Sequence, residues 1–267
     1  MKIVCVGAGS MAEAMIHGWV NKRILKPDDI AVMNKSDLER LEFLRDEYGV
    51  HIVEAEKTEL TNANFVLLAM KPKDLAAALA PIKEKFSPGT VILSIVAGVS
   101  IGAIQKHAGD LAVARAMPNT SARVGKSATG VAWNKQVTLE KQHELRELLS
   151  SIGTVTVVKE EQLDAVTAVA GSGPAYLYFM AEAMAEAAVA QGLSKEDAAK
   201  LVRQTFSGAA DMLQSGGFAE LRQKVTSPNG TTAAGIAMLE QRQFKQIVGD
   251  CVQAACLRSQ ALGREFD

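Results

Sequence analysis

Short apolar runs alternate with helical-looking segments through the first 158 residues, and this alternation restricts the possible folds more than any other feature. The runs span a few residues each and are largely apolar, as in residues 64–70 (NFVLLAM). Strands that are apolar on both faces are typical of a parallel sheet covered by crossover helices. The runs occupy 2–7, 30–33, 64–70, 90–97, 111–116, 128–133 and 154–158, and the helical segments 11–22, 37–48, 72–86 and 138–151. The sequence therefore predicts an α/β domain over residues 1–158.

The remaining residues, 159–267, predict an all-helical domain. Helical periodicity covers 175–191, 195–214 and 243–262, and Gly192, Gly216 and Gly217 mark helix ends. Ser194 followed by Asp197 resembles a capping box that opens the second of these helices.

The helix at 175–191 carries only two charges, Glu182 and Glu186, and is apolar over most of its circumference. A domain of this size has little room to enclose such a helix. We therefore expect it to pack against a second subunit; the alternative is a helix in the interior of its own domain.

Charge and composition exclude several classes of protein. The formal net charge is −1, from 29 basic and 30 acidic residues, so nothing favours nucleic acid or an anionic membrane as a partner. No run reaches the roughly 18 apolar residues of a membrane span. The 3 cysteines are too few for a disulfide framework, which favours a reducing, cytoplasmic location. The 4 histidines lack metal-ligand spacing, so we expect no metal site.

A glycine-rich turn, VGAGSMAEA at residues 6–14, directly follows the first predicted strand. Gly7 permits a tight turn, Gly9 allows a diphosphate to approach the backbone, and the small Ala12 permits close packing of helix on strand. The helix that follows offers free N–H groups and a positive dipole end. This order of strand, turn and helix predicts a dinucleotide site, with a plain glycine-rich turn as the alternative.

The end of the second strand indicates which dinucleotide is bound. An NAD site usually has Asp or Glu there to bind the ribose hydroxyls. This chain has Asn34, Lys35 and Ser36 instead, so a cation stands where the carboxylate would be. Lys35 would attract a 2′-phosphate, and the sequence predicts NADPH, with NADH as a second possible donor. The alternative is an ordinary polar loop, since Asp37 and Glu39 follow closely.

The predicted reaction does not require a strong acid or base from the protein. A dehydrogenase acting on an alcohol needs a base, usually His or Lys, and residues 160–194 contain no Lys, Arg or His. A protonated C=N bond is already electrophilic and needs only orientation and a hydrogen bond.

Seven stretches together resemble pyrroline-5-carboxylate reductases, and the resemblance covers essentially the whole chain in order. Two of them, VTAVAGSGPAY and VTSPNGTTAAG, are specific, because other nicotinamide folds do not carry them. The stretches are VGAGSMAEA, NKS, AMKPKD, SIVAGVS, RAMPNT, VTAVAGSGPAY (166–176) and VTSPNGTTAAG (225–235). The resemblance implies NADPH-dependent reduction of 1-pyrroline-5-carboxylate to L-proline, a Rossmann-type domain, and a helical dimerisation domain whose dimers often assemble into decamers.

The resemblance also assigns site residues. It places Gly7, Gly9, Ser10 and Met11 at the diphosphate, Asn34, Lys35 and Ser36 at the 2′-phosphate, and Ala69, Met70, Lys71, Pro72 and Ala97 along the cofactor crevice. The substrate loop maps onto Val225, Ser227, Asn229, Gly230, Thr231 and Thr232. Thr232 matches the hydroxyl that hydrogen-bonds the imine nitrogen, and its alternative role is that of a helix cap. Backbone N–H groups near Gly230 and Thr231 suit a substrate carboxylate.

Three residues depart from the family pattern. Asn229 replaces a frequent glycine, and asparagine tolerates left-handed backbone geometry best among the residues other than glycine. Lys35 replaces a frequent arginine, which removes a bidentate phosphate contact. Glu56 replaces an asparagine that commonly contacts adenosine. Two other functions stay open: reduction of another cyclic imine, and a non-catalytic NADP-binding paralogue with a regulatory role.

Overall fold

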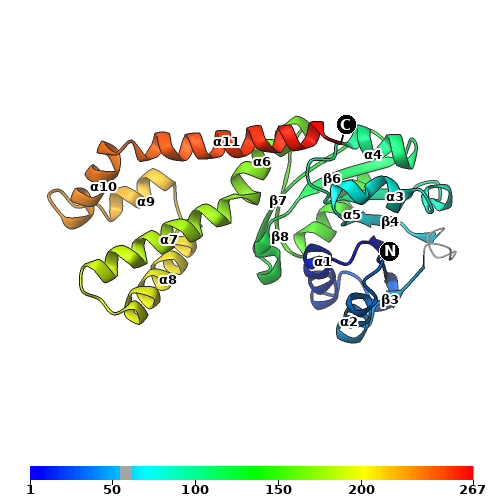
Figure 1. Ribbon diagram of the computed structural model, residues 1–267, viewed down its shortest axis with the longest axis horizontal. Coiled ribbons are helices and arrows are strands. Elements are labelled where there is room, and N and C mark those ends of the chain that lie inside the picture. Colours follow the sequence, from blue (N-terminus) through cyan, green and yellow to red (C-terminus); the bar gives the residue numbers. More distant parts are fainter. Residues whose placement is uncertain (55–61, 267) are drawn as a thin grey trace. The chain divides into compact units, whose positions relative to one another are not determined.

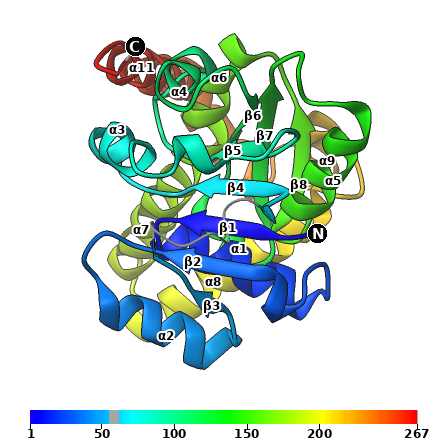
Figure 2. The same cartoon turned by 90° about the vertical axis from the view of Figure 1, so that its right-hand side faces the viewer.

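The computed structural model describes residues 1–54 and 62–266, and its first part is an α/β sheet domain. The described strands form one sheet in the order β3-β2-β1-β4-β5-β6-β7-β8. Figure 2 shows β1 between β2 and β4, the point where the strand order reverses. The strands are β1 (Ile3–Val6), β2 (Ile30–Met33), β3 (His51–Ile52), β4 (Phe65–Leu68), β5 (Val91–Ser94), β6 (Ala112–Met117), β7 (Ser127–Trp133) and β8 (Gly153–Val157). The predicted Rossmann-type domain is confirmed.

One strand pair departs from the parallel pattern. β7 runs antiparallel to β6, whereas every other neighbouring pair is parallel. A parallel return needs a crossover of a dozen or more residues. The connection at residues 118–126 is too short for that crossover, so the chain turns back directly.

Side chains of the central strands alternate between two apolar cores, one on each face of the sheet. In β1, Ile3 and Cys5 join one core, and Val4 and Val6 join the other. The first core is covered by α1 (Ser10–Asn21), α2 (Leu38–Tyr48) and α5 (Leu139–Ser150), and the second by α3 (Leu75–Leu79) and α4 (Ile101–Ala108). Burial on both faces explains why these strands read as continuous apolar runs.

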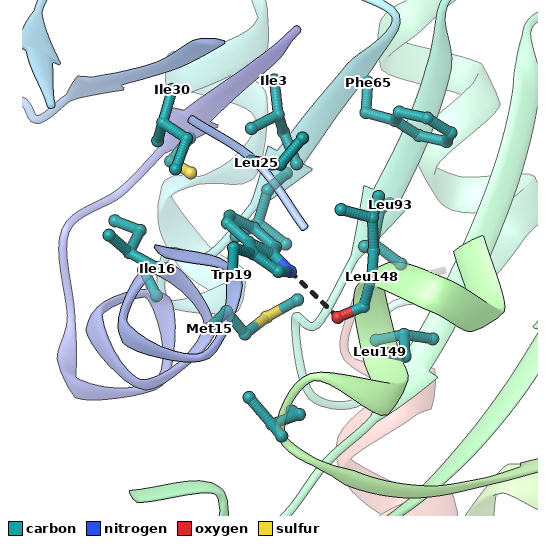
Figure 3. Close-up of a cluster of buried hydrophobic side chains, with 14 of the residues drawn as sticks. Ile3, Met15, Ile16, Trp19, Leu25, Ile30, Phe65, Leu93, Leu148 and Leu149 are labelled. Atoms are coloured by element: carbon teal, nitrogen blue, oxygen red, sulfur yellow. Dashed lines mark hydrogen bonds between the residues drawn. The ribbon is translucent and has the colours of Figure 1, made fainter. Parts of the chain in front are cut away.

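Trp19 of α1 joins helices that lie far apart in the sequence. Its ring is fully buried, and its Nε1 donates a hydrogen bond to the carbonyl oxygen of Leu148 in α5 at 2.9 Å (Figure 3). Met15, Leu25 and Leu148 lie around the ring in the same view. Replacing such a buried aromatic by alanine typically costs about 3–5 kcal/mol.

The rest of the chain is helical. The chain divides into one compact unit of Met1–Ser172 with Ala255–Asp267 and a second unit of Gly173–Ala254. In the second unit α7 and α8 lie side by side (Figure 1). The α-helices after β8, counted over both units, are α6 (Leu163–Val166), α7 (Gly173–Ala190), α8 (Lys195–Met212), α9 (Phe218–Lys224), α10 (Thr231–Gln241) and α11 (Phe244–Arg264). The sequence predicts a boundary between residues 158 and 159, which separates a cofactor-binding domain from a substrate-binding and dimerisation domain. The division into compact units does not test this boundary, which remains a prediction.

Helix α7 is not the interior helix that the sequence left as an alternative. Within the described chain none of its residues is buried, and Leu177, Tyr178 and Phe179 are exposed by 59%, 67% and 73%. The end of α7 and the start of α8 follow prediction. Gly192 has a φ of +99°, and the Ser194 hydroxyl accepts a hydrogen bond from the Asp197 N–H at 3.0 Å.

Three elements differ from the sequence-based expectation. The helix expected at 72–86 breaks into α3 and two short 3-10 turns, because Pro81 lacks an N–H and cannot continue a helix. α4 was not expected, since Gly102 and its short length obscure its pattern; the Ser100 side chain caps it by accepting from the Ala103 N–H at 3.0 Å. β3, with two residues, is too short to show any alternation.

Candidate cofactor-binding and substrate-binding sites

Gly7 joins the carboxyl ends of three strands in a conformation that requires glycine. Its φ is +106°, and a Cβ built there would lie 2.4 Å from the carbonyl oxygen of Ala69. The Gly7 N–H donates to the Met33 carbonyl at 2.9 Å, and the Ala69 N–H donates to the Val6 carbonyl at 2.9 Å. The ends of β1, β2 and β4 therefore meet around this residue.

The start of α1 presents open backbone. Gly9 is the residue before the helix, with φ −71° and ψ 177°, and apart from Gly9 and its two chain neighbours no described residue has an atom within 4 Å of a Cβ built on it. No side chain of the described chain caps this helix start. The N–H groups of the first turn, which includes Ser10 and Met11, have no acceptors within the helix. Free amides and a positive dipole end suit a diphosphate, so the backbone here fits a dinucleotide.

The loop after β2 carries an exposed lysine, and no ion pair of this lysine is found among the described residues. Lys35 and Ser36 are exposed, and the Asn34 side-chain oxygen accepts the Lys35 N–H at 2.8 Å. The Asp37 carboxylate accepts the Arg40 N–H at 3.0 Å and caps α2. Because Asp37 serves as a helix cap, its presence does not turn this loop into an NAD-type acidic site.

Two further strand ends contribute to the same edge of the sheet. Ala69 and Met70 follow β4 and are half-buried, Lys71 is exposed, and Pro72 begins a 3-10 turn. Ala97 lies after β5 and is exposed. In open α/β sheets, ligands bind outside the carboxyl ends of the strands where the strand order reverses. The structure thus gathers all predicted cofactor residues at the edge where a dinucleotide is expected.

The side chain of Asn119, in the loop after β6, donates a hydrogen bond to a π-helical turn. Its Nδ2 donates to the Ala170 carbonyl at 2.9 Å, and its Oδ1 accepts the Ser121 N–H at 3.1 Å. Ala170 lies in the π-helix Thr167–Gly171, where the Ser172 N–H donates to the Thr167 carbonyl at 2.8 Å. Short π-helices are frequent at functional sites.

The substrate residues assigned by resemblance come together at the α9–α10 connection. The Gly230 N–H donates to the Ser227 carbonyl at 3.1 Å, and Asn229 has a φ of +58°. Proline at the second position and a positive φ at the third are typical of a type II turn. Asn229 thus adopts the left-handed geometry that the sequence indicated it would tolerate.

Helix α10 begins immediately after this turn. Gly230 precedes the first helical residue, Thr231, and no side chain of the described chain caps the helix start. Val225, Thr231 and Thr232 are exposed. Arg222 of α9 and Glu240 of α10 form an ion pair of 3.7 Å across the two helices. The roles of these residues remain predictions, and the contact predicted for Glu56 falls outside the described residues.

The fold, the glycine turn and the open helix start define a Rossmann-type dinucleotide-binding protein. Residues 2–98 match the family model "NADP oxidoreductase coenzyme F420-dependent". Residues 160–262 match the model "Pyrroline-5-carboxylate reductase dimerisation".

Full-length relatives carry the same name. Pyrroline-5-carboxylate reductase 2 of Bacillus subtilis is 43% identical over 99% of this chain and 96% of its own length. The pyrroline-5-carboxylate reductase of Synechocystis sp. is 38% identical, over 97% of each chain.

Solved structures agree with these relatives. A pyrroline-5-carboxylate reductase from Coxiella burnetii has a TM-score of 0.93 at 34% identity, over 98% of each chain. The Plasmodium falciparum pyrroline carboxylate reductase with NADP bound has a TM-score of 0.85 at 29% identity, over 98% of each chain. The chain belongs to the pyrroline-5-carboxylate reductase family.

Proposed function

We propose that this protein reduces 1-pyrroline-5-carboxylate to L-proline with NADPH, the last step of proline biosynthesis. The observation that carries the proposal is the turn at 227–230, which opens α10 with free backbone donors and places Thr231 and Thr232 in its first turn. Relatives named for this activity match the chain over nearly its full length. NADPH, when bound, supplies a hydride to the carbon of the C=N bond.

The protein's own contribution is to bind and orient the imine. Backbone N–H groups at the start of α10 hold the substrate carboxylate, as helix N-termini hold other anions. The Thr232 hydroxyl hydrogen-bonds the imine nitrogen. That nitrogen arrives protonated and keeps its proton, so hydride addition yields the neutral secondary amine without an acid from the chain. The absence of Lys, Arg and His from residues 160–194 supports this assignment.

The preference for NADPH is assigned to the loop after β2. Lys35 provides a positive charge for the 2′-phosphate, and Asn34 and Ser36 provide polar groups beside it. A lysine attracts the phosphate as a point charge and lacks the bidentate geometry of arginine. NADH therefore serves as a weaker second donor.

The helical domain is proposed to form a homodimer. Residues 160–262 match a dimerisation model, and the described chain leaves large apolar side chains of α7 exposed. Exposed apolar surface of this kind marks a protein interface. Assembly of such dimers into decamers is a further proposal, taken from the resemblance.

The location is proposed to be the cytoplasm. All of the cysteines are free, with Cys5 buried and Cys251 exposed, as a reducing compartment favours. None of the helices among the described residues is long and apolar enough to cross a membrane.

The function is tested with purified protein, 1-pyrroline-5-carboxylate, and NADPH or NADH. We expect oxidation of NADPH with formation of proline, at a higher kcat/KM than with NADH. Thr232→Ala is expected to lower kcat by about 10- to 100-fold, because the imine loses the hydrogen bond that orients it for hydride transfer. The control, Thr205→Ala, removes a threonine whose hydroxyl donates to the Leu201 carbonyl of its own helix, α8.

Three outcomes contradict parts of the proposal. Reduction of another cyclic imine in preference to pyrroline-5-carboxylate would reassign the substrate. NADPH binding without turnover of any imine would favour the regulatory paralogue. Unchanged turnover per folded molecule in Thr232→Ala, together with lower stability, would make Thr232 a helix cap only.

A further inference from the structure

Arg40 of α2 reaches the glycine-rich turn that the cofactor is proposed to occupy. Its Nε donates a hydrogen bond to the carbonyl oxygen of Ala8 at 2.8 Å, and Ala8 lies between Gly7 and Gly9. A trans peptide is planar, with its C=O and N–H pointing in opposite directions. By holding the Ala8 carbonyl, Arg40 therefore directs the Gly9 N–H away from α2, and Gly9 borders open space.

The same guanidinium neutralises an acid at the start of α1. Arg40 Nη2 forms an ion pair with Glu13 Oε2, and the Tyr48 hydroxyl donates to Glu13 Oε1 at 3.3 Å. Burial, the charge of Glu13 and this hydrogen bond raise the pKa of Tyr48 above its ordinary value, which already keeps the hydroxyl protonated at neutral pH. Glu13 lies in the first turn of α1, where an unpaired carboxylate would repel a diphosphate.

Arg40 is itself held in place. Its backbone N–H is bound by the Asp37 carboxylate, and its guanidinium lies 5.1 Å from the centre of the Phe43 ring. The side chains of Arg40 and Glu13 are only 24% and 19% exposed. One guanidinium serves a carbonyl through Nε and a carboxylate through Nη2, and a lysine ammonium cannot reproduce this fixed geometry.

We propose that Arg40 is a positioning residue for the dinucleotide, acting through the Ala8–Gly9 peptide and through neutralisation of Glu13. The inference rests on the proposed NADPH-binding role of the turn. The proposed role of Arg40 is in binding the diphosphate, which NADPH and NADH share. The proposed role of Lys35 is in binding the 2′-phosphate, which only NADPH carries. The two residues thus have separable effects on the two cofactors.

The test measures the dissociation constants of NADPH and NADH for the full-length protein by titration of nucleotide fluorescence. We expect Arg40→Met to weaken both cofactors by a similar factor of about 10- to 100-fold, the loss of charge-assisted hydrogen bonds. Arg40→Lys is expected to restore little of this affinity.

Two variants provide comparisons. Arg45→Met removes an arginine of the same helix that is half-exposed and pairs with its neighbour Asp46, and it should leave both dissociation constants unchanged. Lys35→Met should weaken NADPH and spare NADH. A ratio of NADPH to NADH affinity that falls in Arg40→Met, as in Lys35→Met, would overturn the proposal, because Arg40 would then act on the 2′-phosphate.

A double variant distinguishes the neutralising role of Arg40 from a purely structural role. Glu13→Gln combined with Arg40→Met removes the uncompensated carboxylate and should recover part of the affinity lost in Arg40→Met. No recovery would overturn the neutralising role of Arg40. Unchanged dissociation constants with a lower Tm in Arg40→Met would overturn the proposal as a whole. Because these readouts are binding constants, they remain decisive if wild-type protein binds NADPH without reducing pyrroline-5-carboxylate.

Discussion

The side chain of Asn119 donates a hydrogen bond from Nδ2 to the carbonyl oxygen of Ala170 at 2.9 Å, and this bond ties the loop after β6 to the π-helical turn before α7. Asn119 is 8% exposed, so few other partners could replace it. Its backbone N–H also donates to the Ser127 hydroxyl at 3.0 Å. Asn119 therefore links the loop after β6 to the start of β7 and to the π-helical turn, within the first compact unit.

We expect Asn119→Ala to lower the free energy of unfolding by about 1–3 kcal/mol, the cost of leaving buried polar groups without partners. Urea denaturation at a fixed protein concentration measures the change. Asn21→Ala, which removes an exposed asparagine from α1, is the control and should stay within about 0.5 kcal/mol of wild type. Equal stability of the two variants would show that the bond to Ala170 contributes nothing.

Gly7 and Gly9 are expected to respond differently to alanine. Gly7→Ala places a Cβ 2.4 Å from the Ala69 carbonyl oxygen at a φ of +106°, and should destabilise the fold by roughly 1–3 kcal/mol from backbone strain alone. In Gly9→Ala the Cβ meets no described atom within 4 Å, so Tm should hardly change. Because that Cβ enters the space proposed for the diphosphate, Gly9→Ala should still weaken NADPH binding. Unfolding curves and nucleotide titration separate the two effects.

Asn229 is expected to tolerate glycine and to resist branched residues. Its φ of +58° suits glycine, while a residue with a Cβ other than asparagine or aspartate pays about 1–2 kcal/mol there. Asn229→Gly should leave the KM for the imine near wild type, and Asn229→Val should raise it several-fold by distorting the turn that opens α10. Steady-state kinetics at saturating NADPH test this; identical KM values would separate the turn from substrate binding.

Cys5 makes stability fall at alkaline pH. Burial raises the pKa of its thiol from 9.0 to about 12. The thiol therefore ionises at lower pH in the unfolded chain than in the folded chain. The contribution of this thiol to the free energy of unfolding is fully present below pH 9 and is lost between pH 9 and pH 12. The slope approaches about 1.4 kcal/mol per pH unit for this one group. Cys5→Ala should lower stability at pH 7 yet flatten the loss above pH 9, and urea denaturation across this range measures both.

Much of the α/β framework is visible in the sequence because burial on both faces requires apolar strands. β1, β2 and β4 stand out as apolar runs, and the order of strand, glycine turn and helix predicts the dinucleotide edge. β3 has two residues and no readable pattern, and α4 contains a glycine. Such short elements owe their conformation to the strands and helices that they pack against.

The residues proposed for the cofactor edge could be identified in the sequence because they follow strand ends directly. Gly7, Asn34 and Ala69 come from separate segments, yet the parallel register of β1, β2 and β4 places their strand ends together. The contacts that support these residues were not readable. Arg40 and Ala8 lie 32 residues apart, and Asn119 and Ala170 lie 51 apart.

Local patterns thus indicate most of the longer strands and helices, and they identify the residues that resemble the family's motifs, because periodicity, φ preferences and charge belong to neighbouring residues. The partner of each polar side chain was decided only by the folded chain. Arg40 could have paired with other acids near it in sequence, and only the packing of α2 against α1 brings it to Glu13 and Ala8. A hydrogen bond forms within about 3 Å, and only tertiary structure sets distances of that size between remote residues.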